Sequence, residues 1–178
     1  MPDTTAATGP AAAARTLAIT LMGSLVFIVL ALWFVLGAKD GALETPPVMI
    51  LAGQLVAGAV IHLLIENVGY RAAALSHSLG PDEVSRRATA AWSTTTPLRF
   101  ALGEAVAITS VALAFIVPHG GFVVAAVGAA VSLVLLLVHV WPGPRPVDKL
   151  ATSLERDGQP SGLREAFGHA AHGPIQEL

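Results

Sequence analysis

Four apolar stretches, each about as long as a bilayer is thick, constrain the fold of this chain more than any other feature. They cover residues 17–37, 48–68, 98–117 and 121–141 of the 178-residue sequence. A helix needs roughly 20 apolar residues, at ~1.5 Å rise per residue, to cross the hydrocarbon core. Backbone groups in lipid must be satisfied internally, and no stretch alternates like a barrel strand. The sequence therefore predicts an all-α polytopic membrane protein with four transmembrane helices.

Composition and motifs argue against several functional classes. The chain has no cysteine, which excludes disulfides, thiolate metal sites and cysteine nucleophiles. The net charge of −2 decides nothing about nucleic acids, but the basic residues are spread along the chain, so we expect no nucleic-acid partner. No Walker loop, GxSxG, HExxH or dinucleotide motif occurs. Because the extramembrane segments are too short for a conventional catalytic domain, we expect neither enzymatic activity nor a cofactor.

The basic residues predict how the chain is oriented. Nine of the ten Lys and Arg residues fall on one face of the membrane, and only Lys39 falls on the other. Cytoplasmic loops carry the excess of basic residues. Both termini and loop 69–97 are therefore predicted to be cytoplasmic, in a bacterial inner membrane. The outer connections are short, so the four spans are expected to form two successive antiparallel hairpins.

The segments before and between the spans are expected to be less regular. Residues 1–16 read as a flexible tail, and the apolar run after them is too long for a cleaved signal peptide. Within loop 69–97, Pro81 and two acidic residues favour a helix that reaches Trp92. That helix lies either at the membrane interface or in solvent. Residues 93–96 are predicted to be a linker, with Thr96 and Pro97 capping and opening the third span.

The region after the fourth span has a different composition. Residues 142–178 are predicted to form a cytoplasmic tail that contains a short helix over 146–156. A further turn or two is expected within 161–168, where apolar side chains recur at i,i+4.

Small and polar residues form a stripe along each span. The stripes are Thr16, Thr20 and Ser24; Gln54, Gly58, His62 and Glu66; Gly103, Ala107, Ser110 and Ala114; and Gly121, Ala125, Gly128, Ser132, Leu135 and His139. Small residues allow membrane helices to approach closely. We expect these stripes to be packing faces of a four-helix bundle, and the alternative is the lining of a permeation path.

Four ionisable residues lie within the predicted spans and form a candidate proton or ion site. Counting ~1.5 Å per residue from the cytoplasmic ends places His62, Glu66, Glu104 and His139 at depths of about 12, 6, 9 and 3 Å. All four therefore belong to the cytoplasmic leaflet. Ionisable groups inside a membrane are costly and commonly mark function.

Three interpretations of these four residues remain open. Imidazoles and carboxylates at different depths suit a proton relay, because imidazole titrates nearest neutrality. Two histidines and two glutamates also suit a divalent metal ion. Alternatively the residues are structural: the glutamates reach the interface or pair with Arg71 and Arg99, and the histidines make interhelical hydrogen bonds.

A short run in the third span resembles a known family. Residues 99–108, RFALGEAVAI, are similar to the ion-carrying helix of rotary ATP synthase c subunits, where an A-L-x-E-A-x-A-I pattern presents the proton-binding carboxylate. The resemblance implies that Glu104 is a protonatable carboxylate. The whole layout, with a charged segment after the fourth span, resembles uncharacterised four-helix bacterial integral membrane proteins. That second likeness implies no particular activity.

Two hypotheses for function follow from the sequence. The first is a structural or accessory helix bundle that associates with a membrane-protein partner or with itself through its small-residue faces. The second is a small proton or ion translocator that uses Glu104, Glu66 and His62.

Overall fold

The protein is all-helical over the described residues. A computed structural model describes residues 9–169. Four helices are long and apolar enough to cross a membrane: α1 (Pro10–Leu36), α2 (Val48–Val68), α3 (Pro81–Ala114) and α4 (Gly121–His139). Two short helices follow, α5 (Pro144–Leu154) and α6 (Leu163–Ala166). The predicted fold class, all-α with four candidate spans, is confirmed at this level.

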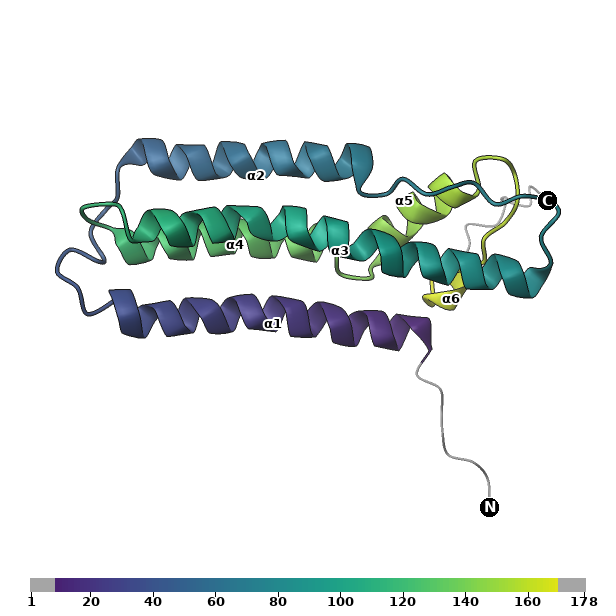
Figure 1. Cartoon of the computed structure of the whole chain (residues 1–178), viewed down its shortest axis with the longest axis horizontal. Coiled ribbons are helices and arrows are strands. Elements are labelled where there is room, and N and C mark those ends of the chain that lie inside the picture. Colours follow the sequence, from purple (N-terminus) through teal and green to yellow (C-terminus); the bar gives the residue numbers. More distant parts are fainter. Residues whose placement is uncertain (1–8, 170–178) are drawn as a thin grey trace, which may run out of the picture.

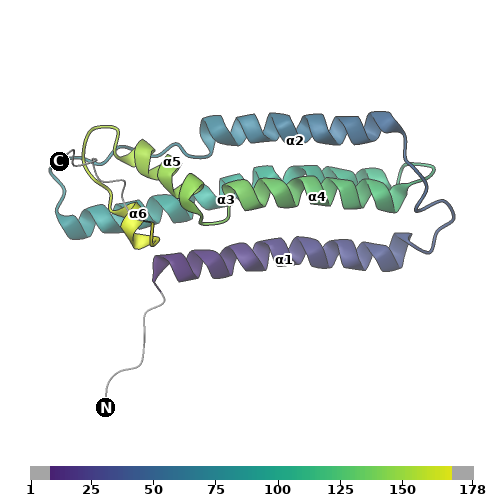
Figure 2. The ribbon, with the colours of Figure 1, turned by 180° about the vertical axis from the view of Figure 1, so that it is seen from behind.

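The four long helices form a layered array around the α3–α4 pair. α1 and α2 flank this pair on opposite sides, and successive long helices run in opposite directions (Figure 1). The view from behind shows the same order (Figure 2). α3 packs most extensively against α4, whereas α1 and α2 contact mainly the central pair and not each other. α1 and α2 therefore depend on α3 and α4 for their positions.

The two outer connections meet at one end of the array. Gly120 N donates a hydrogen bond of 2.7 Å to Gly41 O, which links the α3–α4 turn to the α1–α2 loop. Gly120 has φ +71°, and a Cβ there would lie 2.7 Å from Glu44 O. Both the left-handed backbone and the close approach require glycine.

Two of the predicted boundaries differ most from the structure, whereas those of the other helices shift by no more than three residues. α1 begins at Pro10, so residues 10–16 are helical and do not belong to a flexible tail; residues 1–8 lie outside the described part of the chain. The predicted linker over 93–96 is wrong, because α3 is one helix of 34 residues that runs through it and contains Pro97. Trp92, Thr96, Arg99 and Gly103 are all buried on one continuous face of α3. Packing on both sides of Pro97 thus outweighs the hydrogen bond that proline removes.

Three of the four predicted packing stripes are interior faces. Every stripe residue of α3 and α4 is buried, as are Gln54 and Gly58 of α2. The stripe predicted for α1 is wrong: Thr16, Thr20 and Ser24 are exposed, and their hydroxyls donate to carbonyls of their own helix. α1 instead packs through large apolar residues at heptad spacing, including Leu25 and Leu32.

A second apolar core lies beyond the ends of α2 and α4. It joins residues 70–80, the first half of α3 and residues 144–167, which contain α5 and α6, into a unit that we call the cap (Figure 1). The buried core residues are Ile65, Tyr70, Leu75, Val84, Ala88, Trp92, Val147, Leu150, Ala151, Leu154, Leu163 and Phe167. Leu75 N donates to Leu154 O at 2.9 Å, which ties the loop after α2 to the end of α5. The C-terminal region is therefore packed through residue 169, and residues 170–178 lie outside the described part.

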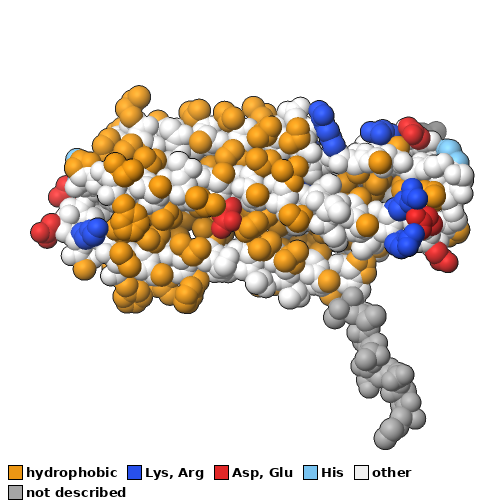
Figure 3. All heavy atoms as spheres, in the orientation of Figure 1, with side chains coloured by type: hydrophobic (Ala, Val, Ile, Leu, Met, Phe, Trp, Pro, Cys, Tyr) orange, Lys and Arg blue, Asp and Glu red, His pale blue; other side chains and the backbone are white. Residues whose placement is uncertain are grey.

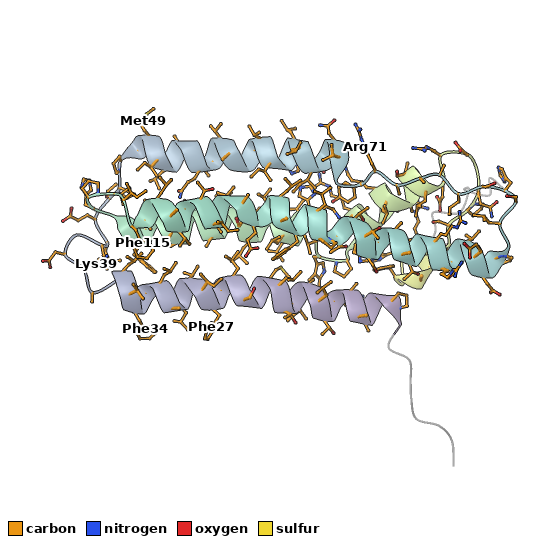
Figure 4. The ribbon with its side chains drawn as sticks, in the orientation of Figure 1. Phe27, Phe34, Lys39, Met49, Arg71 and Phe115 are labelled. Carbon is orange, nitrogen blue, oxygen red and sulfur yellow. The ribbon has the colours of Figure 1, made fainter. Side chains whose placement is uncertain are left out.

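The outer surface of the array is apolar. Phe27 and Phe34 are 70% and 76% exposed and point away from the bundle, as Figure 4 shows. Met49 is 82% exposed at the start of α2. Orange side chains cover much of the helical region in Figure 3; charged side chains gather toward the two ends, apart from an acidic group among the orange ones. Such a continuous apolar surface fits a lipid environment.

Candidate functional site

Three of the four predicted site residues come together where α2 and α4 end. His62 and Glu66 share one face of α2, and His139 is the last residue of α4. One ligand atom from each of the three lies within 4.8 Å of the others. Helix spacing of i,i+4 on α2 and the antiparallel packing of α2 near α4 make this convergence possible.

The two histidines and Tyr70 form a hydrogen-bonded chain. His62 Nδ1 lies 2.8 Å from His139 Nε2, and the Tyr70 hydroxyl lies 2.9 Å from His139 Nδ1. Burial raises the pKa of the Tyr70 phenol above its usual value, although nearby Arg99 opposes this shift. A protonated phenol that donates to Nδ1 leaves the proton of His139 on Nε2, which then donates to His62. The chain therefore has a consistent set of tautomers.

Glu66 pairs with two basic residues of α5. Its carboxylate accepts from Arg145 at 2.9 Å and also from Lys149, and it lies 3.8 Å from His139 Nδ1. The pairing with Arg71 that the structural interpretation allowed does not form, since Arg71 Nε donates instead to the backbone carbonyl of Asn67. The cation partners of Glu66 thus come from the cap.

Arg99 is fully buried beside this chain. Its guanidinium donates to His139 O at 2.8 Å and to Thr96 Oγ1 at 2.9 Å. It also lies over the rings of Tyr70 and Trp92, with centroid distances of 4.8 and 4.6 Å. His139 O is one of the carbonyls left free at the end of α4, where the helix dipole favours a cation. Arg99 therefore closes the C-terminus of α4.

Glu104 stands apart from this cluster. It is half-buried on α3, and within residues 9–169 its side chain has no hydrogen bond or ion pair. Arg99, its predicted partner, bonds to α4 instead. Counted from Arg99, Glu104 lies ~8 Å further along the axis of α3, toward the outer end. Its neighbours one turn away, Phe100 and Ile108, are apolar.

A second polar contact lies deeper between α2, α3 and α4. Gln54 Nε2 donates to Ser110 Oγ at 2.7 Å and to Val124 O at 2.8 Å. Ser110 Oγ in turn donates to Val106 O at 2.6 Å. Gln54 Oε1 is the one buried side-chain polar atom in the described part without a hydrogen-bond partner. Gln54 lies eight residues before His62, about 12 Å along α2, so the two polar groups are separate.

The converging donors do not favour a metal ion. Both ring nitrogens of His139 are engaged, by His62 and by Tyr70, and the oxygens of Glu66 are held by Arg145 and Lys149. A divalent cation would have to displace these cations and sit close to buried Arg99. The chemistry of the set fits hydrogen bonding and proton exchange better than metal ligation.

Sequence reasoning identified the titratable residues but missed their partners. Tyr70, Arg145 and Lys149 all lie outside the predicted spans, so no pattern within a span pointed to them. One signal was available: Tyr70 is the only tyrosine in the chain and follows a span directly, where amphipathic aromatic residues concentrate.

Comparisons of the chain with protein-family models, curated proteins and solved structures found no match.

Proposed function

We propose that the protein is a non-enzymatic helix bundle of the bacterial inner membrane that associates there with a partner membrane protein or with a second copy of itself. Both termini face the cytoplasm in this proposal. The basic residues support the orientation, because all of them except Lys39 lie at the start of α1, in the cap or, for Arg99, next to the cap.

The observation that carries this proposal is the placement of Glu104. A carboxyl group inside the membrane costs about 2.5–3.5 kcal/mol on insertion scales unless it finds a partner. Glu104 has none within the described part of the chain. One turn away on α3, Ile108 is exposed and Phe100 packs on an apolar cluster that includes Leu25 of α1. A donor from a neighbouring protein would satisfy it, as polar side chains commonly do between membrane helices.

The saturated cluster at the ends of α2 and α4 supports a structural role for the remaining ionisable residues. His139, Arg99 and Glu66 each have partners from at least one other element. These contacts tie α2, α3 and α4 to the cap. Fully satisfied polar networks fix the relative positions of helices.

The association can be tested by purifying the full chain in a mild detergent and counting subunits after reconstitution into lipid vesicles. We expect a stoichiometric partner or a homo-oligomer from the wild type, and weaker association from Glu104→Leu. Glu104→Gln keeps hydrogen-bonding capacity without charge and should retain more association than Glu104→Leu.

Thr20→Val is the matched control. Thr20 is also polar and exposed to lipid, but its hydroxyl is satisfied within α1, so this change should leave association intact. A clean monomer in vesicles, with no co-purifying partner, would contradict the proposal.

A second candidate function, proton translocation, is favoured by one observation. The chain from Tyr70 through His139 to His62 provides three exchangeable protons in series. It reaches only the inner part of the array, because the buried polar side chains further toward the outer face, Ser132 and Gln54, bond to other partners.

Proton flux in proteoliposomes separates the two candidates. A translocator should conduct above empty vesicles and lose flux in His139→Phe and in Glu104→Gln. Wild-type vesicles that conduct no better than empty ones would eliminate translocation and leave the association proposal untouched.

A further inference from the structure

A groove open to lipid runs between α2 and α4. Its volume is about 580 Å³, within the range of small-molecule pockets. Its walls are almost wholly apolar, with Leu55 and Ala59 on one side and Val131, Val134 and Val138 on the other. His62 and Arg145 close the end that faces the cap.

The end of the groove carries an excess of positive charge. Arg145 and Lys149 share the single carboxylate of Glu66, and Lys149 and Arg71 line a second pocket of about 370 Å³ together with that glutamate. Asp148 also lines that pocket, but Arg164 pairs with it at 2.7 Å. The side chain of Arg145 is half exposed. A guanidinium has five donors, so Arg145 can keep Glu66 and still bind another anion.

We propose that this groove binds an anionic phospholipid, with one acyl chain along α2 and α4 and the phosphate at Arg145 and Lys149. The arrangement matches such a lipid because the apolar part lies at membrane depth and the cationic part lies where α2 and α4 leave it. Basic residues at that level attract anionic headgroups.

The size of the groove distinguishes a lipid from a protein partner. A helix 10–12 Å across occupies ~400–600 Å³ per turn, so the groove would accept little more than one turn of it. A flexible acyl chain fills a long narrow volume without this limit. The inference is independent of the association proposed above, which rests on Glu104 of α3, a residue that does not line this groove.

The test compares phosphatidylglycerol with phosphatidylcholine, which share acyl chains but differ in net charge. The full chain is purified in mild detergent, each lipid is added at equal concentration, and bound lipid is measured by native mass spectrometry. We expect tighter binding of phosphatidylglycerol. Arg145→Gln should weaken that binding about five-fold, the effect of one basic residue at a membrane surface. It should weaken phosphatidylcholine binding less, because the choline cation offsets the charge of its phosphate.

A second variant blocks the apolar part. Ala130 lines the groove and is exposed, so Ala130→Trp fills it without entering the core and should abolish retention of either lipid. Two matched controls should bind like the wild type. Arg87→Gln removes another exposed arginine that pairs with a glutamate, and Ala52→Trp adds the same bulk to α2 outside the groove.

Three results would overturn the proposal. In the first, the wild type binds the two lipids equally well. In the second, Ala130→Trp retains lipid as well as the wild type does. In the third, Ala130→Trp changes the oligomeric state while lipid binding stays intact. The last would assign the groove to a second copy of the chain.

Discussion

Arg99 is fully buried, yet within the described residues no carboxylate pairs with it. A buried guanidinium is tolerated here because its surroundings supply negative potential in other forms. The free carbonyl end of α4, the hydroxyl of Thr96 and two aromatic faces replace the counter-ion. The side chain thereby joins the membrane helices to the cap.

Replacing Arg99 with methionine should destabilise the protein by about 2–4 kcal/mol, since His139 O loses its donor and two cation–π contacts disappear. The stability of Arg99→Lys should fall between that of the wild type and that of the methionine variant, because an ammonium lacks the planar fork of a guanidinium. The measurement is denaturant unfolding in micelles. Arg71→Met, at an exposed arginine that bonds only within its own segment, should behave like the wild type. Equal losses of stability in Arg99→Met and Arg71→Met would contradict this role for Arg99.

Glu155 gives the cap a dependence on pH. Burial on its own would raise the pKa of the Glu155 carboxyl, but hydrogen bonds from Ser161 and Arg164 outweigh it and hold this pKa below its usual value. The carboxylate therefore stabilises the cap above the unfolded pKa of about 4.3, and the effect is lost as pH falls through the lower folded value.

Glu155→Gln should accordingly speed hydrogen exchange in α5 and α6 at neutral pH. The loss of protection that the wild type shows between about pH 5 and pH 3 should be smaller in this variant. Glu165→Gln, at an exposed carboxyl of α6, is the control. A wild-type profile in the Glu155 variant would show that these hydrogen bonds add no stability.

Sequence alone found the titratable groups at this scale but not their roles. His62, Glu66 and His139 were detectable because polar residues in apolar helices are conspicuous. Their partners depend on how α5 folds back over the ends of α2 and α4, and no local pattern encodes that contact. Glu104 looked equivalent to the other three by depth, yet it does not join the cluster that they form.

The stripes of small residues correctly indicated the packing faces of α2, α3 and α4, because backbones that approach closely need small side chains. The stripe failed in α1, which packs through leucines, so its Thr and Ser residues were free to bond to their own backbone. The predicted break before the third span failed for a related reason. Proline penalises a helix locally, whereas the buried face of α3 continues on both sides of Pro97.

Gly128→Ala tests the tightest of these approaches. A Cβ at Gly128 would overlap the side chain of Ser110, which also holds Gln54. Overpacking of this kind costs about 1–3 kcal/mol, so the melting temperature in detergent should fall. Gly23→Ala is the control, because a Cβ at Gly23 meets nothing within 4 Å. Similar melting temperatures for the two variants would rule out a tight contact.

At the scale of the whole molecule, the proposed orientation is directly accessible to labelling. The chain has no cysteine, so single-cysteine variants report without background. Asp40→Cys, in the outer connection, should react with a membrane-impermeant maleimide in intact cells. Ser78→Cys and Asp157→Cys, both in the cap, should react only after the cells are opened. The reverse pattern would invert the topology.

The layered order of the helices was not predictable from their lengths and loops. A short connection between α1 and α2 suggests direct packing, but the loop instead spans the end of the α3–α4 pair and is held there by Gly120 and Gly41. Whether neighbours in sequence become neighbours in space depends on which faces complement each other. The packing faces of α1 and of α2 both complement α4.

The composition of the cap core has a consequence for biosynthesis. One half of that core comes from residues 65–92 and the other from residues 147–167. Translation supplies the second half only after all four membrane helices have been made. Until then the nascent chain presents Val84, Trp92 and their neighbours uncovered. The cap core can therefore be completed only after α4 has been made, and a chain that stops after α4 would leave this apolar surface uncovered.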